Sequence, residues 1–249
     1  MALAEIAADL CLLAGGKNPA PFTSAIIVSA GSSTRMGTKI SKQFLTVNGL
    51  PVLAHTLLAF EKARHINEII VVARPEDMEQ VWQIAEQYDI KKLIAVTRGG
   101  ATRAASVRCG FRKIDPKAKY VAIHDGARCL ITPDQIGKVC RTAYRYQAAT
   151  AATAVTDTVK TVSRKGFITG TIDRRKVFTV QTPQVFHTDL YRAALANVTD
   201  NSLTDDNQLM EKIRHPVRPV DFGKDNIKIT TPDDIPRAEF ILSNRKETL

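Results

Sequence analysis

The chain has 249 residues, 44% of them hydrophobic, which is enough for one large domain with a substantial core. It carries 35 Lys and Arg against 25 Asp and Glu, a net charge of +10 that suits anionic small molecules; no long basic run or known nucleic-acid module occurs, so a nucleic-acid partner is disfavoured. Its four cysteines have neither the spacing of a zinc site nor that of a disulfide framework, which favours a reducing, cytoplasmic location.

Residues 1–21 are predicted to form an N-terminal extension and a linker. The first half of this stretch is apolar and helical in pattern, but Glu5 and Asp9 interrupt it and no basic residue precedes it, unlike in a signal peptide. Gly, Asn and Pro in the second half favour a linker. We therefore expect residues 22–249 to form the main domain, in which no apolar run is long enough to span a membrane.

The first strong strand signal, Ala25 to Ser29, leads directly into a loop of small residues, 30–37. The backbone amides of such a loop can approach a polyphosphate, and Arg35 and Lys42 place two cations where charge develops in phosphoryl chemistry. The pattern predicts a nucleotide bound at its phosphates. An ordinary strand-to-helix turn rich in small residues is the alternative that the loop alone leaves open.

Two well-known phosphate loops do not fit this segment. A Walker loop requires Lys and Ser or Thr directly after its second glycine, whereas Gly37 is followed by Thr38 and Lys39. The dinucleotide fingerprint requires a second glycine where Ser33 stands, so a nicotinamide or flavin enzyme is disfavoured. A loop of the nucleotidyltransferase kind remains.

Apolar runs and amphipathic segments then alternate along the chain. This alternation predicts an α/β fold of the Rossmann-like kind, with a mainly parallel sheet, helices on both faces and ligands at the carboxyl ends of the strands. The later predicted strands are Glu68 to Ala73, Leu93 to Thr97, Tyr120 to His124 and Ala151 to Val155, and the predicted helices are Pro51 to Ala63, Pro75 to Gln87, Pro133 to Gln147 and a last one starting at Thr231.

Residues 156–182 break this alternation and are predicted to form a projecting β-hairpin with its turn around Lys165. A two-stranded hairpin is only marginally stable alone. We therefore expect a partner surface, such as a second subunit, to hold it. The alternative is a hairpin that lies on its own domain.

An acidic residue, Asp125, follows the strand that ends at His124 and is itself followed by Gly126, Ala127 and Arg128. A carboxylate at a strand's carboxyl end can hold Mg²⁺ against a triphosphate, and Arg128 can meet a second phosphate. The alternative, an Asp that only caps the next turn, explains this element equally well. Upstream, residues 99–106 form a glycine-to-helix junction suited to a base or ribose contact.

The order of these motifs closely resembles that of the 2-C-methyl-D-erythritol 4-phosphate cytidylyltransferase family, over roughly residues 24 to 242. The further motifs that carry the resemblance are Asp157-Thr158, Asp173-Arg174, Thr182-Pro183-Gln184, Thr204-Asp205-Asp206 and Asn226-Ile227-Lys228-Ile229-Thr230. The resemblance implies that CTP and methylerythritol 4-phosphate give the cytidine diphosphate sugar alcohol and pyrophosphate, in the methylerythritol route to isoprenoids.

The resemblance also implies roles for individual residues. Arg35 and Lys42 match the residues that stabilise the transition state at the α-phosphate, and Arg174 and Lys228 match the pair that positions the attacking phosphate. Mg²⁺ would lie on Asp125, and no nucleophilic side chain is required. The CTP site would contain Ser29, Ala30, Gly31, Gly100, Ser106 and Gly126, and the sugar phosphate site Asp125, Arg128, Thr158, Arg174 and Thr204.

The hairpin carries Thr158 and Arg174, and in this family it exchanges with a second subunit. The resemblance therefore implies a homodimer in which these two residues complete the neighbour's active site. The sequence departs from the family pattern at Cys129, where proline commonly follows the arginine, and this departure puts the geometry of the loop of Arg128 in doubt. Other departures are at Ser33, Gly126 and Asn207.

Two rival functions remain open from the sequence. Ribitol 5-phosphate cytidylyltransferase shares the loop, the His-Asp-x-x-Arg element and the Asn-Ile-Lys motif, and differs mainly in its acceptor alcohol. A catalytically silent nucleotide-binding or regulatory module on the same fold is the other. The charged residues Arg35, Lys42, Asp125, Arg174 and Lys228 are all present, which argues against the silent module.

Overall fold

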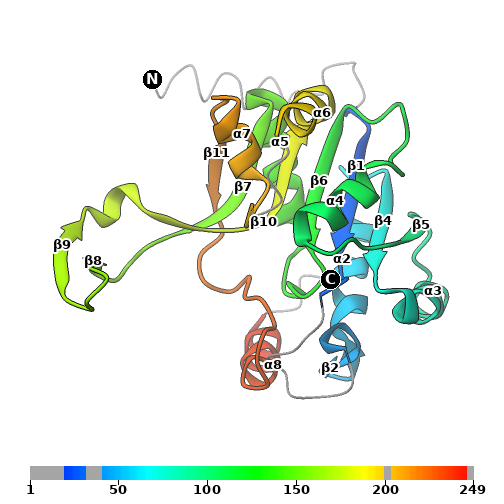
Figure 1. Cartoon of the computed structure of the whole chain (residues 1–249). Coiled ribbons are helices and arrows are strands. Elements are labelled where there is room, and N and C mark those ends of the chain that lie inside the picture. Colours follow the sequence, from blue (N-terminus) through cyan, green and yellow to red (C-terminus); the bar gives the residue numbers. More distant parts are fainter. Residues whose placement is uncertain (1–19, 32–40, 199–202, 246–249) are drawn as a thin grey trace, which may run out of the picture.

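The computed structural model describes residues 20–31, 41–198 and 203–245, so residues 1–19 of the predicted extension and Arg35 lie outside the described residues. A seven-stranded sheet with the order β11-β7-β10-β6-β1-β4-β5 forms the centre of the fold (Figure 1). Its strands are β1 (Thr23–Val28), β4 (Glu68–Ala73), β5 (Leu93–Arg98), β6 (Tyr120–Asp125), β7 (Ala148–Ala154), β10 (Phe178–His187) and β11 (Arg218–Asp221).

The strand directions confirm the predicted mainly parallel sheet. β1 pairs in parallel with β4 and β6, β4 with β5, and β7 with β11, whereas β10 runs antiparallel to its neighbours β6 and β7. The five predicted strands are present, although the fifth starts at Ala148 rather than Ala151. β10 and β11 were not predicted, because each contains a proline, at Pro183 and Pro219.

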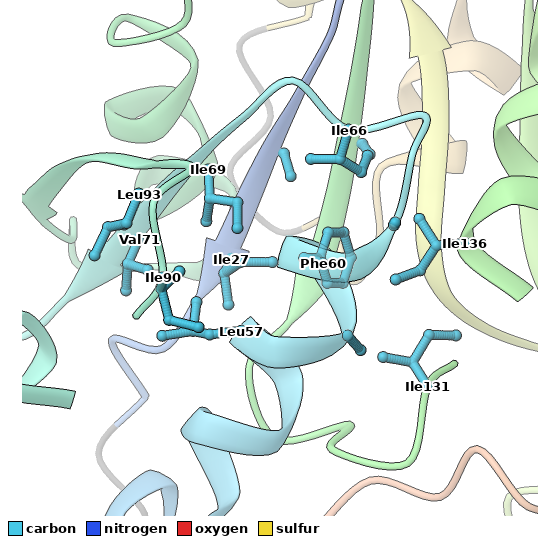
Figure 2. Packing of buried hydrophobic residues seen from close by; sticks show 14 of the residues in the cluster. Ile27, Leu57, Phe60, Ile66, Ile69, Val71, Ile90, Leu93, Ile131 and Ile136 are labelled. Carbon is cyan, nitrogen blue, oxygen red and sulfur yellow. The ribbon is translucent and has the colours of Figure 1, made fainter. Parts of the chain in front are cut away.

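Helices cover both faces of the sheet, as predicted. α2 (Val52–Lys62), α3 (Met78–Gln87) and α5 (Pro133–Tyr146) pack on one face, and α4 (Arg103–Phe111), α6 (Thr188–Asn197) and α7 (Asn207–Lys212) pack on the other. Successive residues of a strand point to opposite faces, so Ile27 joins the first core cluster and Ile26 the second. Figure 2 shows Leu57 and Phe60 of α2 beside Ile27. Of the helices described, none is long and apolar enough to cross a bilayer.

A third, smaller core cluster joins α8 (Asp234–Asn244) to Val47 of β2 (Thr46–Val47) and to the loop of residues 127–130. In the chain, β2 lies between η2 (Lys42–Phe44) and β3 (Leu50–Pro51). Figure 1 shows α8 beside β2, away from the large sheet. The last helix starts later than predicted, at Asp234 rather than near Thr231. The Asp234 carboxylate accepts the N–H groups of Thr230 and Thr231, both at 2.8 Å, and so fixes the turn that leads into the helix.

The predicted hairpin is present as β8 (Val159–Val162) and β9 (Ile168–Ile172), followed by η4 (Arg174–Lys176). Gly166 takes a φ of 84° in the turn, where a glycine avoids the strain of a side chain. Figure 1 shows this arm projecting away from the sheet beyond β7 and β10. The arm is shorter than predicted, because β10 begins at Phe178 and pairs with β7 from there.

Candidate active site

A cavity of about 400 Å³ opens where β1, β5 and β6 end, as expected for the carboxyl edge of a parallel sheet. Most of the residues predicted from the sequence to bind the nucleotide lie in its lining. The lining contains Ser29, Ala30, Gly31, Lys42, Gln43, Gly100, Thr102, Arg103, Ser106, Asp125 and Lys228. Loops far apart in the sequence therefore meet around one polar space.

The junction between β5 and α4 is fixed by its own hydrogen bonds. The N–H of Gly100 donates to Ser106 Oγ at 3.1 Å, and this hydroxyl donates to the carbonyl oxygen of Thr102 at 2.9 Å. The side chain of Thr102 caps α4 by accepting the N–H of Ala105 at 3.1 Å. A side chain at Gly100 would have its Cβ 2.5 Å from that of Ala105. This junction brings the positive end of α4 to the cavity, which favours an anionic ligand.

Asp125, at the end of β6, lies among three cations. Lys228 Nζ is 2.7 Å from Asp125 Oδ2, Arg103 Nε is 3.4 Å from Oδ1, and Arg128 Nε is 3.9 Å from Oδ2. Burial alone would raise the pKa of Asp125, but Lys228 and Arg103 lower it well below the usual value. The carboxylate is therefore ionised at neutral pH although its residue is only 8% exposed.

Arg103 was not predicted as a site residue, and it connects Asp125 to a second buried carboxylate. Its NH1 lies 2.6 Å from Asp206 Oδ2, and Tyr191 donates its hydroxyl to Asp206 Oδ1 at 2.6 Å. Burial alone would lower the pKa of Arg103, but Asp206 and Asp125 raise it. The only sequence signal was its place directly after the Thr102 cap, at the start of a helix that faces the site.

A second cavity, of about 260 Å³, lies beside the first. Asp125, Arg103 and Lys228 line both cavities and so form their common wall. The lining of the second cavity also contains Arg128, Gln181, Thr182, Gln184, Thr204 and Asp205, of which Arg128 and Thr204 were predicted to bind the sugar phosphate. The structure thus places two polar cavities side by side, separated by one layer of charged side chains.

A buried histidine supports this wall from behind. Thr182 Oγ1 accepts the N–H of Asp125 at 3.0 Å and lies 3.1 Å from His124 Nδ1, and His124 Nε2 lies 3.2 Å from the carbonyl oxygen of Arg128. The carbonyl oxygen of Arg128 can only accept, so in a neutral ring Nε2–H donates to it, Nδ1 is an acceptor, and the Thr182 hydroxyl donates to Nδ1. Burial lowers the pKa of His124 to about 3, so the ring is neutral and Arg128 is held despite Cys129 following it.

The other predicted residues lie elsewhere. Gly126 is buried next to Ser29 and does not line the first cavity, and a Cβ at position 126 would collide with the Ser29 hydroxyl. Thr158 and Arg174 are exposed on the arm and line neither of the two adjacent cavities. These two residues are therefore not brought to the wall within one chain.

The donor set around Asp125 fits Mg²⁺ only together with a phosphate ligand. Within the described residues, no group of three His, Cys, Asp or Glu side chains could hold a metal ion. Mg²⁺ is commonly held by one or two carboxylates, with substrate phosphates and waters as its remaining ligands. An ionised Asp125 beside a cavity suited to phosphates provides such a carboxylate.

Comparison with known proteins agrees with this arrangement. Residues 23–244 match the family described as "2-C-methyl-D-erythritol 4-phosphate cytidylyltransferase". A relative of that name from Caldanaerobacter subterraneus subsp. tengcongensis is 40% identical over 222 residues, which cover 88% of this chain and 98% of the relative. The crystal structure of 4-diphosphocytidyl-2C-methyl-D-erythritol synthase from Anaerococcus prevotii superposes with a TM-score of 0.80 at 32% identity, and covers 90% of this chain and 97% of that chain.

Proposed function

Since the chain belongs to the 2-C-methyl-D-erythritol 4-phosphate cytidylyltransferase family, we propose that each of the two adjacent cavities binds one of its two substrates. The protein is a nucleotidyltransferase that transfers CMP from CTP to 2-C-methyl-D-erythritol 4-phosphate and releases pyrophosphate, in non-mevalonate isoprenoid biosynthesis. The observation that carries the site assignment is the wall of Asp125, Arg103 and Lys228 shared by both cavities.

The 400 Å³ cavity takes CTP in this proposal, and the 260 Å³ cavity takes the polyol phosphate. The attacking phosphate and the α-phosphate of CTP then approach each other across the wall, where Lys228 and Arg103 reduce the repulsion between two anions. Lys42, with Arg35, steadies the charge that develops on the α-phosphate. The acceptor's own phosphate oxygen is the nucleophile, so no covalent intermediate with the protein is needed.

Asp125 is the residue that would hold Mg²⁺ in this reaction. When bound, the ion neutralises part of the triphosphate charge and makes pyrophosphate a better leaving group. Lys228 would contact the same Asp125 carboxylate as the ion. Arg103 keeps this carboxylate ionised and oriented toward both cavities.

The arm is proposed to pack against a second copy of the chain. Its two strands pair with each other alone within the described residues, and Val162, Phe167 and Ile168 are 59%, 71% and 67% exposed. Apolar exposure on a marginally stable hairpin favours association. In the homodimer, Thr158 and Arg174 would reach the partner's polyol phosphate site. The domain boundary near residue 22 and the cytoplasmic location stay predictions.

Pyrophosphate release with CTP and Mg²⁺ tests the activity. We expect turnover with 2-C-methyl-D-erythritol 4-phosphate and at least about 100-fold lower kcat/KM with ribitol 5-phosphate, because a site that hydrogen-bonds a particular set of hydroxyls discriminates strongly. Preference for ribitol 5-phosphate would overturn the choice of acceptor. Binding of CTP without turnover of either acceptor would favour the silent module.

Mixed dimers test the shared site. Lys42→Ala and Arg174→Ala chains are each expected to be impaired, and mixing them should restore part of the activity, since one of the two sites in a mixed dimer then has both residues. Native mass spectrometry would verify that mixed dimers form. Verified mixed dimers without any recovery would show that Arg174 serves its own chain.

A further inference from the structure

A buried carboxylate, Asp77, lies directly behind the turn that carries Lys42. Asp77 is 6% exposed and ends η3 (Pro75–Asp77), which follows β4. Its Oδ2 accepts hydrogen bonds from Ser41 Oγ at 3.1 Å and from Gln43 Nε2 at 3.1 Å. Ser41 and Gln43 are the two residues on either side of Lys42, and both are buried.

The orientation of this carboxylate sets it apart from an ordinary helix cap. Asp77 occupies the N-cap position of α3 but makes no side-chain hydrogen bond to that helix. An Asp at this position usually accepts an N–H of the first turn. Here Arg74 holds the carboxylate instead, with Nε 2.8 Å from Oδ2 and NH2 3.0 Å from Oδ1, and it also bonds Ser41. The side chain is committed to the turn of Lys42 rather than to its own helix.

The same turn is tied to the phosphate-loop side of the cavity. Gln43 Nε2 donates to the carbonyl oxygen of Ser29 at 2.8 Å as well as to Asp77. Ser29 follows β1, so one buried amide links the ends of β1 and β4. Lys42 lines the cavity between these two anchors. The backbone that carries Lys42 is thus fixed on both sides, although the lysine side chain itself is long and flexible.

We propose that Asp77 is a positioning residue for the reaction: by holding Ser41 and Gln43, it fixes the backbone from which Lys42 reaches the transferred phosphate. This inference rests on the proposed role of Lys42. Asp77 itself does not line the CTP cavity and does not touch substrate. Positioning matters because an error of about 1 Å in a catalytic group can lower the rate about 100-fold.

The test is a double-mutant cycle with Asp77→Asn, Lys42→Ala and the double variant. Asp77→Asn keeps the size of the side chain but replaces one acceptor oxygen with a donor, which opposes the bonds from Gln43 and Arg74. We expect kcat to fall about 10- to 100-fold and the dissociation constant of CTP to change less than about threefold. In the Lys42→Ala background the same substitution should lower kcat less than about twofold, because two residues that act through one contact are not additive.

Two further variants complete the design. Asp89→Asn removes the same charge at the other end of α3, where the Asp89 side chain is 78% exposed, and it should leave kcat unchanged. Ser41→Ala removes the hydroxyl that bonds both Asp77 and Arg74, and should lower kcat about three- to tenfold; it carries the test if Asp77→Asn does not fold. Thermal unfolding of each variant identifies those that are folded at the assay temperature.

The outcomes separate this inference from the proposed function. Equal losses of kcat in the wild-type and Lys42→Ala backgrounds, for Asp77→Asn or for Ser41→Ala, would show a structural role only and overturn the inference. Unchanged kcat in folded Asp77→Asn would overturn it too. A Lys42→Ala variant with full kcat would instead remove the proposed role of Lys42, whatever Asp77 does.

Discussion

The common wall of the two cavities differs from the arm in how its side chains find partners. At the wall, the charges of Asp125, Asp206, Arg103 and Lys228 meet partners from distant parts of the same chain. On the arm, large apolar side chains such as Phe167 point into solvent. The chain thus completes its charged centre by itself, whereas the arm keeps apolar surface for another molecule.

This difference distinguishes side chains that are paired within one chain from side chains that need a second molecule to cover them. Buried charges are costly unless they have partners, and Asp125 and Asp206 find their cations within the same chain. Apolar side chains on an exposed hairpin cost the single chain little, because they remain hydrated until a second surface covers them. Substitutions at the wall should therefore change catalysis and stability, and those of the exposed apolar side chains on the arm should change association.

The largest expected effect lies beside the wall, at Lys42. Lys42→Ala should lower kcat about 100- to 1000-fold with little change in CTP affinity, because its contact strengthens as charge develops on the α-phosphate. Steady-state pyrophosphate release and calorimetric CTP titration would measure the two quantities. Lys113→Ala, an exposed lysine near the opposite edge of the sheet, is the control. Parallel loss of CTP affinity and of kcat would assign Lys42 to ground-state binding instead.

The next largest expected effect is a loss of stability when Arg103 is removed from the wall. Arg103→Met leaves Asp206, whose side chain is 4% exposed, without its cation, and should lower the free energy of unfolding by about 3 kcal/mol. Arg192→Met, which breaks a pair with side chains 56% and 69% exposed, should lower it by less than about 0.5 kcal/mol. Urea denaturation of both variants provides the measurement. Similar losses would mean that burial of the pair is not what matters.

A third prediction concerns pH. Burial lowers the pKa of His124 to about 3 from 6.5, so the unfolded chain binds a proton between these values that the folded chain does not. Stability therefore falls as pH drops below about 6.5, and this histidine alone should remove about 2 kcal/mol between pH 7.5 and pH 5. Burial also lowers the pKa of His65, to about 4, so the wild-type loss is larger.

The contribution of each histidine can be isolated by substitution. Denaturation of His124→Gln at the two pH values should show a loss smaller by about 2 kcal/mol, and His65→Gln should show a smaller reduction, because solvent screens the half-buried His65. An unchanged pH dependence in His124→Gln would mean that His124 does not stay neutral in the fold.

The smallest effect on stability is expected on the arm. Ile168→Ser should change the free energy of unfolding of the chain by less than about 0.5 kcal/mol, because Ile168 is 67% exposed, yet it should weaken dimerisation. Phe240→Ser on α8, at 71% exposure, should affect neither. Sedimentation across a concentration series distinguishes them. Dimers of equal stability in both variants would place the association surface elsewhere.

The sequence predicted those parts of the fold whose signal is local. β4 matches its predicted bounds, Glu68 to Ala73, because a continuous apolar run marks a strand buried on both faces. β10 was missed because Pro183 and several polar residues interrupt the pattern of a strand that nevertheless lies inside the sheet. The antiparallel direction of β10 depends on the arm that precedes it, which no local pattern encodes.

In the candidate site too, residues with a local sequence signal were predicted and residues that depend on distant contacts were missed. Asp125 was predicted from its place at a strand end, and the nucleotide-binding loops from their small residues. Arg103 was missed because its partner Asp206 lies 103 residues away in the sequence, and only the folded chain brings them together. Asp77 was missed because it lies in the first turn of the helix predicted from Pro75, where an acidic residue is ordinary, and its carboxylate contacts an earlier turn instead.

The direction of β10 has a consequence for communication within the protein. Its first residue, Phe178, continues the arm, while Thr182 in the same strand accepts the backbone N–H of Asp125. The arm and the strand that backs Asp125 therefore belong to one continuous stretch of backbone. A second subunit bound to the arm, as proposed above, would hold the same stretch that carries the hydrogen-bond acceptor of the Asp125 N–H.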